Sequence, residues 1–254
     1  MNTLPQIMIA PNGARRSKQD HPALPITIPE TIATARDCFH AGANGLHLHV
    51  RGSHGEHSLD AGLYREALDE LKVAVPNMMV QITTEAVGIY SPQEQQQVVR
   101  DVKPNAVSIA VAEMLAHDDH SAVIDFYNWC SHSKIKVQHI LYSPGDTIRL
   151  EELLSSLTPT TDLVQLLFVL GRYTKNQQST PEDLLPFTDW LSTSNLEADW
   201  SICAFGKAET RCLKASHEAG GKMRIGFENS FWNDDGSLAH DNVERILDLK
   251  KAIN

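Results

Sequence analysis

Two histidines and an arginine alternate with apolar residues in the segment Gly45–Arg51. Because alternate side chains of a β-strand share one face, His47, His49 and Arg51 would all point the same way. Two neutral imidazoles at this spacing can bind one divalent ion such as Zn²⁺, with a carboxylate as the usual third ligand and one position left open. The alternative is a polar strand end whose histidines bond to neighbouring backbone, since His-x-His alone is a common pattern.

The segment that carries these histidines is one of eight short apolar or β-branched segments. The predicted strands are residues 7–10, 45–51, 78–84, 106–110, 136–142, 163–170, 200–205 and 223–228. Each is followed by an amphipathic segment with helical periodicity. Capping residues predict helix starts at Thr27, Asp60, Ser91 and Thr180, and Gly42 ends the first helix. The other helices are predicted over residues 119–129, 146–157, 209–219 and 238–253.

Eight strand–helix pairs in about 250 residues predict an α/β fold of the (β/α)₈ TIM barrel type. We expect one catalytic domain over residues 1–254. A doubly wound parallel sheet is the alternative, but no GxGxxG follows the first predicted strand and no GxxxxGK[ST] occurs. Because the chemistry of a barrel lies at the carboxyl ends of its strands, position along a strand tests every candidate residue.

A carboxylate passes this test at the end of the last predicted strand. Glu228 shares a face of that strand with Arg224, and Asn229 begins the following loop. Strands eight, one and two are neighbours in a closed barrel, so Glu228 can complete a two-histidine, one-glutamate metal site with His47 and His49. An internal ion pair between Arg224 and Glu228 is the alternative, since buried charges are normally paired.

Three hydroxyls also lie where strands end or close to it. Thr83 and Thr84 end the third predicted strand and Ser108 lies on the fourth. Such hydroxyls could donate to an oxyanion or relay a proton. The alternative is that they are ordinary strand residues.

The remaining histidines and two long loops have weaker signals. His54 and His57 are expected to be solvated in the loop over residues 52–58, and His139 on the fifth strand is ambiguous. The loops over residues 52–58 and 171–179 are long enough to act as lids. The other histidines are expected to be structural or exposed, namely His21, His40, His117, His120, His132, His217 and His240.

Composition limits the class of protein. The chain has 254 residues, 42% of them hydrophobic and 21% charged, which is typical of a soluble globular protein. The net charge of -10 argues against a nucleic-acid partner. We find neither a signal peptide nor a membrane-length apolar run, and therefore expect a cytoplasmic protein. The four cysteines lack CxxC spacing and are expected to be reduced thiols.

Several motifs taken together resemble the β-keto acid cleavage enzyme family, also called the 3-keto-5-aminohexanoate cleavage enzyme family. The matching segments are Asn12-Gly13-Ala14, Leu24-Pro25-Ile26-Thr27, Ala41-Gly42-Ala43, the HxHxR motif of residues 47–51, Gln81-Ile82-Thr83-Thr84, residues 165–171, residues 200–207 and the GGxxRxGxEN motif of residues 220–229. They extend over almost the whole chain. The combination of HxHxR with GGxxRxGxEN is far more specific than either motif alone.

The resemblance implies a zinc-dependent barrel that condenses a β-keto acid with acetyl-CoA to give acetoacetate and a new acyl-CoA. It implies His47, His49 and Glu228 as metal ligands, and Thr83, Ser108 and Arg224 as residues that bind or activate the keto acid. We add Asn229 as a catalytic candidate, and Asn12, Arg15, Arg51, Thr84 and Glu85 as substrate-binding candidates. A homo-oligomer, a tetramer by family resemblance, is also implied.

The chain departs from the family pattern at functionally important positions. Asn229 stands where the family usually has Asp, and an amide cannot accept a proton. Arg15 stands where the first loop usually has an acid, Glu85 replaces a glycine, and the loop from Gly171 lacks the family's pair of glycines. The alternatives are therefore a binding or regulatory barrel that has lost catalysis, and a metal-dependent hydrolase or class II-type aldolase. Against the hydrolase, amidohydrolase barrels usually carry their HxH motif on strand one.

The fifth predicted strand bears on the choice of keto acid. Its residues 137–142 include no acid, so this wall offers no carboxylate to pair with an amino group on the substrate. Burying an unpaired cation would cost several kcal/mol. Glu85 near the mouth could supply a negative charge, whereas Arg15 and Arg51 favour anions. We expect a neutral or anionic β-keto acid.

Overall fold

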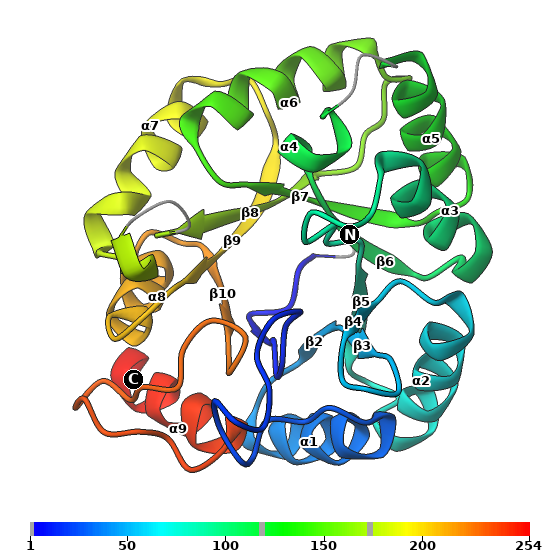
Figure 1. Cartoon of the computed structure of the whole chain (residues 1–254). Coiled ribbons are helices and arrows are strands. Elements are labelled where there is room, and N and C mark those ends of the chain that lie inside the picture. Colours follow the sequence, from blue (N-terminus) through cyan, green and yellow to red (C-terminus); the bar gives the residue numbers. More distant parts are fainter. Residues whose placement is uncertain (1–2, 117–119, 172–174) are drawn as a thin grey trace.

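A ring of strands surrounded by helices makes up the molecule (Figure 1). The computed structural model describes residues 3–116, 120–171 and 175–254. His117, the predicted helix start at Asp119 and part of the predicted lid over residues 171–179 lie outside the described residues. Among the described helices, none has the length and apolar character needed to cross a membrane.

The strands close into a parallel barrel in the order β1-β10-β9-β8-β7-β6-β5-β2, with β1 paired to both β10 and β2. The barrel strands are β1 (Ile7–Ile9), β2 (Gly45–Leu48), β5 (Met79–Thr83), β6 (Ala106–Ala110), β7 (Lys136–Leu141), β8 (Val164–Leu170), β9 (Ala198–Ala204) and β10 (Lys222–Ile225). The predicted TIM barrel is therefore confirmed. All five residues of β6 are buried, as expected for a parallel strand covered on both faces.

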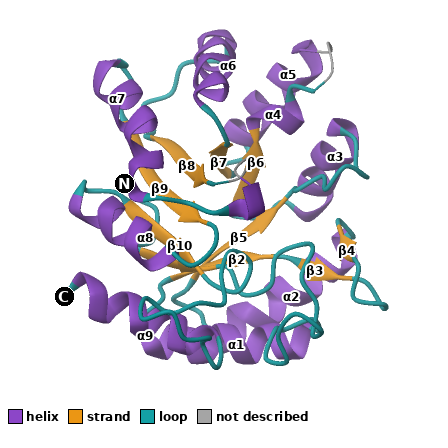
Figure 2. Cartoon of the chain, turned by 60° about the vertical axis from the view of Figure 1, so that its left-hand side comes forward, coloured by secondary structure: helices purple, strands orange, loops and turns teal. Residues whose placement is uncertain are grey.

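The histidine strand is shorter than predicted. It leaves the barrel after Leu48, and β3 (Val50–Arg51) pairs with β4 (His57–Ser58) in an antiparallel hairpin. Figure 2 shows this hairpin apart from the barrel strands and close to α2. The predicted continuous strand over residues 45–51 was therefore wrong in its last residues, because β3 finds its backbone partner in its own loop.

Helices cover the outside of the barrel. They are α1 (Ile28–Ala41), α2 (Ala61–Ala74), α3 (Pro92–Val102), α4 (Val111–Met114), α5 (His120–His132), α6 (Pro144–Ser156), α7 (Leu185–Thr193), α8 (Glu209–Glu218) and α9 (Asn242–Ile253), with 3₁₀ turns η1 (Lys175–Gln177) and η2 (Pro181–Leu184). Thr27 and Ser91 form the predicted capping boxes, and Asp60 caps α2. The helix α9 packs against α1 and α8, which closes the ring beside β1 and β10 (Figure 1).

The helix predicted to begin at Thr180 opens as the 3₁₀ turn η2, and α7 begins only at Leu185. Two other helix starts also differ from the sequence prediction. The helix α6 begins at Pro144. Ser143 is its N-cap, and the Asp146 side chain completes the capping box by accepting from the backbone N–H of Ser143. The last helix begins at Asn242 with Asp241 as its cap, whereas Leu238 forms a bridge with Trp232 before it. In both cases the capping chemistry, and not the apolar pattern, sets the first turn.

The apolar core lies between the barrel and its helices. Leu46, Leu71 and Ile82 are among the fully buried side chains, and each contributes about 1.5–3 kcal/mol by leaving water. Polar side chains are buried as well, including Gln81, Gln138 and Ser201 on three barrel strands. The barrel is thus held from outside by apolar packing, while part of its buried surface is polar.

Candidate metal centre at the carboxyl ends of the strands

His47 and His49 lie at the carboxyl end of β2 and are both 1% exposed. Their Nε2 atoms are 3.2 Å apart, and His47 Nδ1 is 3.1 Å from Gln81 Oε1 on the adjacent strand β5. A side-chain amide oxygen only accepts hydrogen bonds, so His47 donates from Nδ1 and its Nε2 has a free lone pair facing His49. This is the tautomer that a metal bound at Nε2 requires.

The prediction that Glu228 ends the last strand was wrong, because β10 ends at Ile225, just before Gly226 with its φ of +139°. Glu228 reaches the same point from the loop after β10. Its Oε2 lies 3.4 Å from His49 Nε2 and 3.7 Å from His47 Nε2. The other oxygen, Oε1, accepts a hydrogen bond of 3.1 Å from Arg224 Nη2. Oε2 accepts no hydrogen bond within the described residues, and His49 Nδ1 has no partner there either. The predicted ion pair and the predicted cluster of metal donors therefore coexist, one on each carboxylate oxygen.

Backbone geometry places Glu228 here. Gly226 has a φ of +139°, and a Cβ on it would lie 2.4 Å from the carbonyl oxygen of Ala10, so the loop passes tightly over β1. Glu228 N donates to that carbonyl at 3.1 Å. Gly13, with a φ of +61°, leaves room for the Glu228 side chain, because a Cβ on Gly13 would lie 2.5 Å from Glu228 Cγ. Two glycines thus define the position of the carboxylate.

Charge and burial set the protonation of His47 and Glu228. Burial lowers the pKa of His47 well below its usual range, and the charge of Arg224 lowers it further. Burial alone would raise the pKa of Glu228, but Arg224 and the two histidines together outweigh burial and hold that pKa well below its usual range. Near neutral pH the site therefore presents a neutral His47 beside an ionised carboxylate, which is the protonation that a divalent cation requires.

The spacing of the donors fits a tetrahedral ion. His47, His49 and Glu228 each offer one atom within 4.8 Å of the others. Zinc bonds of about 2.0–2.2 Å imply roughly 3.3 Å between ligand atoms at the corners of a tetrahedron. The observed separations of 3.2, 3.4 and 3.7 Å agree with this value. Glu228 Oε2, which accepts no hydrogen bond within the described residues, and the set of two imidazoles with one carboxylate together fit a zinc-like ion.

Further buried polar atoms near these strand ends have no partner in the described part of the chain. They are both amide atoms of Asn12, both amide atoms of Asn229, Ser108 Oγ and Arg224 Nε. A buried polar group without a partner costs free energy, so several of them at one end of a barrel suggest that a ligand completes them. Asn12, Ser108, Arg224 and Asn229 therefore stay candidates for contacts with substrate.

Two other predicted site residues, Thr83 and Thr84, hydrogen bond to the protein itself. The Thr83 hydroxyl accepts a hydrogen bond from Glu85 N, and the Thr84 hydroxyl donates to Ser108 O. Arg15 is exposed, and Glu85 is partly buried. The roles predicted for these four residues toward substrate stay predictions.

Arg51 contacts the backbone of the loop after β1. Its guanidinium donates to the carbonyl oxygens of Asn12, Gly13, Arg16 and Gly55, at 2.7–3.3 Å. Arg51 therefore holds this loop, and the predicted direct contact of Arg51 with substrate stays a prediction.

Two histidine predictions are resolved by the structure. His57 was expected to be solvated, but it is 6% exposed, its Nε2 donates to Glu85 O at 2.7 Å, and its ring lies 5.4 Å from that of His49. Burial lowers the pKa of His57 to about 4. The hairpin of β3 and β4 brings it inward. His54 is exposed, as expected.

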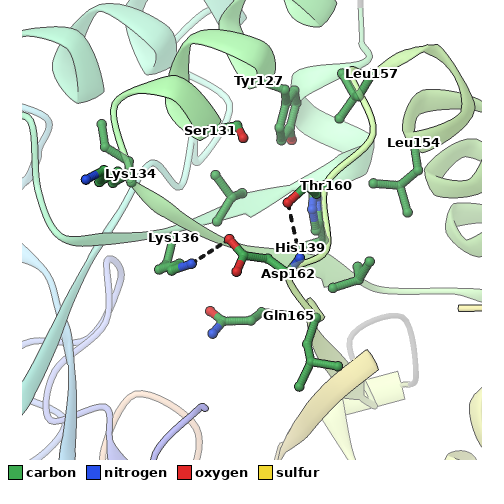
Figure 3. A pocket seen from close by; sticks show the side chains of 14 residues that line it. Tyr127, Ser131, Lys134, Lys136, His139, Leu154, Leu157, Thr160, Asp162 and Gln165 are labelled. Atoms are coloured by element: carbon green, nitrogen blue, oxygen red, sulfur yellow. Dashed lines mark hydrogen bonds and ion pairs between the residues drawn. The ribbon is translucent and has the colours of Figure 1, made fainter. Parts of the chain in front are cut away.

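His139 faces away from the metal donors. Its ring stacks on Tyr127 of α5 with 5.4 Å between centroids, and both line a cavity of about 120 Å³ that Leu154 of α6 also lines (Figure 3). Lys136 Nζ is paired with Asp162 Oδ2 at 2.7 Å beside it. None of the three candidate metal ligands lines this cavity. The ambiguous His139 therefore belongs to the outer layer of the barrel.

Three residues near the donors were not identified from the sequence. Gln81 bonds to His47, and it lies two residues before Thr83 on the same strand face, which is the signal that could have revealed it. Arg16 donates to the carbonyl oxygens of Glu228 and Asn229, both at 3.2 Å. Gly13 and Gln81 were noted only as parts of motifs. No local pattern connects Arg16 or Gly13 to a loop more than 200 residues away.

Comparisons with known proteins agree with this architecture. Residues 6–254 match the family model described as beta-keto acid cleavage enzyme. A 3-keto-5-aminohexanoate cleavage enzyme from Acetoanaerobium sticklandii is 25% identical over 252 residues, which cover 94% of this chain and 89% of that protein. A 3-oxoadipate:acetyl-CoA acetyltransferase from Cupriavidus necator is 23% identical over 250 residues, covering 94% and 85%.

A solved structure shares the fold. It is described as a binary complex of ObcA with oxaloacetate and superimposes with a TM-score of 0.68 at 15% identity. The match covers 91% of this chain and 63% of that one.

Proposed function

The chain belongs to the β-keto acid cleavage enzyme family, and from this we propose that it condenses a β-keto acid with acetyl-CoA, releasing acetoacetate and a new acyl-CoA. The observation that carries the proposal is the meeting of His47, His49 and Glu228 at the carboxyl ends of the barrel strands. The names of two relatives, a 3-keto-5-aminohexanoate cleavage enzyme and a 3-oxoadipate:acetyl-CoA acetyltransferase, support it.

We propose Zn²⁺ as the metal, held by His47, His49 and Glu228. When bound there, such an ion supplies a Lewis acid for the β-carbonyl oxygen of the keto acid. Arg224 keeps Glu228 ionised and holds its Oε1, so that Oε2 faces the two imidazoles. The protein thus provides the fixed, buried ligand set that this chemistry needs.

Arg224 is also our candidate for binding the substrate carboxylate. Burial alone would lower its pKa, but Cys203 and Glu228 raise it, so the guanidinium is charged throughout the physiological range. Its Nε is buried without a partner in the described part of the chain. Ser108 Oγ and the Asn12 amide are further donors for the keto acid, and Thr83 stays a candidate beside Ser108 on the neighbouring strand.

Asn229 follows the metal-binding Glu228 and cannot act as a base. Its amide is fully buried, and neither of its polar atoms has a partner among the described residues. We assign it to hydrogen bonding with substrate, with any proton transfer made by another group. The same observation favours a second candidate function, a binding barrel of this family that holds a keto acid or CoA without turnover.

The substrate we favour is a neutral or anionic β-keto acid. No residue of β7, Lys136–Leu141, is an acid, so this wall cannot neutralise an amino group. Gln138 on β7 already hydrogen bonds to protein groups with both of its amide atoms. The predicted cytoplasmic location and tetrameric state stay predictions.

A panel of β-keto acids, each incubated with and without acetyl-CoA, tests the reaction. We expect acetoacetate and a new CoA ester to form only when acetyl-CoA is present. Turnover at the same rate with and without acetyl-CoA would favour a metal-dependent hydrolase or aldolase. Binding of the keto acid or CoA without turnover would favour the binding barrel. A highest kcat/KM for an amino-keto acid would contradict the substrate class.

Metal content tests the site independently of the reaction. Untagged protein should contain about one zinc per chain, and His47→Ala should lose it. His240→Ala is the matched control, because the side chain of His240 is 89% exposed. Equal zinc content in the two variants would disprove the site.

A further inference from the structure

A chain of hydrogen-bonded side chains runs from His47 across the inside of the barrel. Gln81 Oε1 accepts from His47 Nδ1 at 3.1 Å, and Gln81 Nε2 donates to Gln138 Oε1 at 3.0 Å. Both glutamines are buried, with exposures of 0% and 1%. The interior of such barrels is usually filled by Val, Ile and Leu, and burying amides costs free energy unless they are hydrogen bonded. Apolar side chains would serve stability alone equally well.

The hydrogen bonds of Gln138 fix which atom donates and which accepts along this series of side chains. Gln138 Nε2 donates to Leu166 O at 3.1 Å and to Ser201 Oγ at 2.9 Å. Ser201 Oγ itself donates to the same carbonyl at 3.4 Å. A backbone carbonyl can only accept, so the Gln138 amide must present its nitrogen to Leu166 and its oxygen to Gln81.

The orientation of the Gln138 amide also determines the tautomer of His47. Because Gln138 offers an oxygen, Gln81 must turn its nitrogen toward Gln138 and its oxygen toward His47. His47 must then be protonated at Nδ1, which leaves the lone pair on Nε2. A flipped amide anywhere in the chain would place two acceptors or two donors face to face.

We propose that Gln81 and Gln138 are positioning residues that hold His47 in its metal-binding tautomer and ring orientation, and that Leu166 O is the fixed acceptor that sets their direction. The inference rests on the proposed function only in taking His47 as a metal ligand. Gln81, Gln138 and Ser201 lie on β5, β7 and β9, which are alternate strands of the closed barrel (Figure 1). Side chains from alternate strands form one layer inside a barrel, which explains how residues from distant segments can meet.

The other histidine gives an internal contrast. His49 Nδ1 has no partner within the described residues, so no hydrogen bond there holds His49 in its metal-binding tautomer. The two ligands are therefore supported unequally, and only His47 should respond to changes in the glutamines.

The test measures the zinc dissociation constant by competition with a chromophoric chelator. Gln81→Leu should weaken zinc binding by about 10–100-fold, the range found when the hydrogen-bond partner of a ligand is removed. Gln138→Leu should give a smaller loss, because Gln81 can then rotate. Gln81→Glu should restore part of the affinity, since a carboxylate still accepts from His47 Nδ1. Gln96→Leu is the matched control, because Gln96 is a buried amide on α3 that donates to Met114 Sδ at 3.6 Å and contacts none of the candidate metal ligands among the described hydrogen bonds.

A second readout uses the metal-free protein. Long-range ¹H–¹⁵N spectra of histidine distinguish Nδ1–H from Nε2–H, and His47 should be Nδ1–H in the wild type and in Gln96→Leu but mixed in Gln81→Leu. The inference is overturned if His47 is Nε2–H in the wild type, or if both glutamine-to-leucine variants bind zinc as tightly as Gln96→Leu. A wild type that binds no zinc yet shows Nδ1–H at His47 would refute the proposed function and leave the tautomer assignment supported.

Discussion

Replacing Gly13 with alanine should displace a proposed metal ligand without touching the metal. The added Cβ would lie 2.5 Å from Glu228 Cγ and 3.1 Å from Glu228 Cβ. Carbon atoms not bonded to each other approach to about 3.5 Å, so the glutamate side chain must retreat by about 1 Å. The hydrogen bond of Glu228 N to Ala10 O limits how far its backbone can follow.

The magnitude follows from two separate causes. Gly13 has a φ of +61°, and an alanine in this left-handed conformation costs about 1–2 kcal/mol. Overpacking against a fixed side chain adds about 1–3 kcal/mol. We therefore expect Gly13→Ala to lower the free energy of unfolding by about 2–5 kcal/mol. A displacement near 1 Å at a catalytic group typically costs about 10²-fold in rate, and zinc affinity should fall by about tenfold or more.

Gly236→Ala is the matched control. Gly236 has a φ of +85°, and a Cβ there meets nothing within 4 Å. It should lose only the backbone cost and keep its zinc affinity. Urea unfolding and chelator competition on both variants decide the matter. If the two variants lose the same stability and bind zinc equally well, then Gly13 does not define the position of Glu228.

Three further changes test other parts of the structure. Burial lowers the pKa of His139 to about 4. Between pH 6.5 and 4, His139 is therefore protonated in the unfolded protein but stays neutral in the folded protein. The free energy of unfolding should therefore fall by up to roughly 3 kcal/mol as the pH drops through this window. Urea unfolding at pH 7 and pH 4.5 measures this loss, which should be smaller in His139→Leu; an equal loss in the variant and the wild type would contradict the argument. Arg245→Met breaks a fully buried ion pair with Glu209 of 2.9 Å and should cost about 3–5 kcal/mol in thermal or urea unfolding, whereas a loss below 1 kcal/mol would refute the contribution we assign to that pair. Arg51→Lys removes the planar guanidinium that donates to four backbone carbonyls, so amide hydrogen exchange should become faster over residues 12–16. Exchange rates equal to those of the wild type would show that Arg51 does not hold this loop.

Features encoded within a few neighbouring residues could be predicted from the sequence. Apolar residues that recur every two positions predicted the strands, and those that recur about every 3.6 positions predicted the helices. These periods appear in the sequence because the backbone geometry of each element decides which side chains share a buried face. Thr27, Asp60 and Ser91 marked helix starts because a cap is satisfied by amides three residues away. His47 and His49 were found in the same way, since their spacing alone puts both donors at one strand end.

Other features depend on residues far apart in the chain, and only the tertiary structure decided them. Whether His57 is solvated depends on the hairpin that folds it against His49. The role of Arg51 depends on four carbonyls that become available to it only when the loops pack. Barrel closure brings Gly13 against Glu228, and it aligns Gln81 with Gln138 so that one carbonyl can set the tautomer of His47. A sequence pattern specifies which face a side chain occupies, but hydrogen-bond direction and steric fit arise only when distant strands meet.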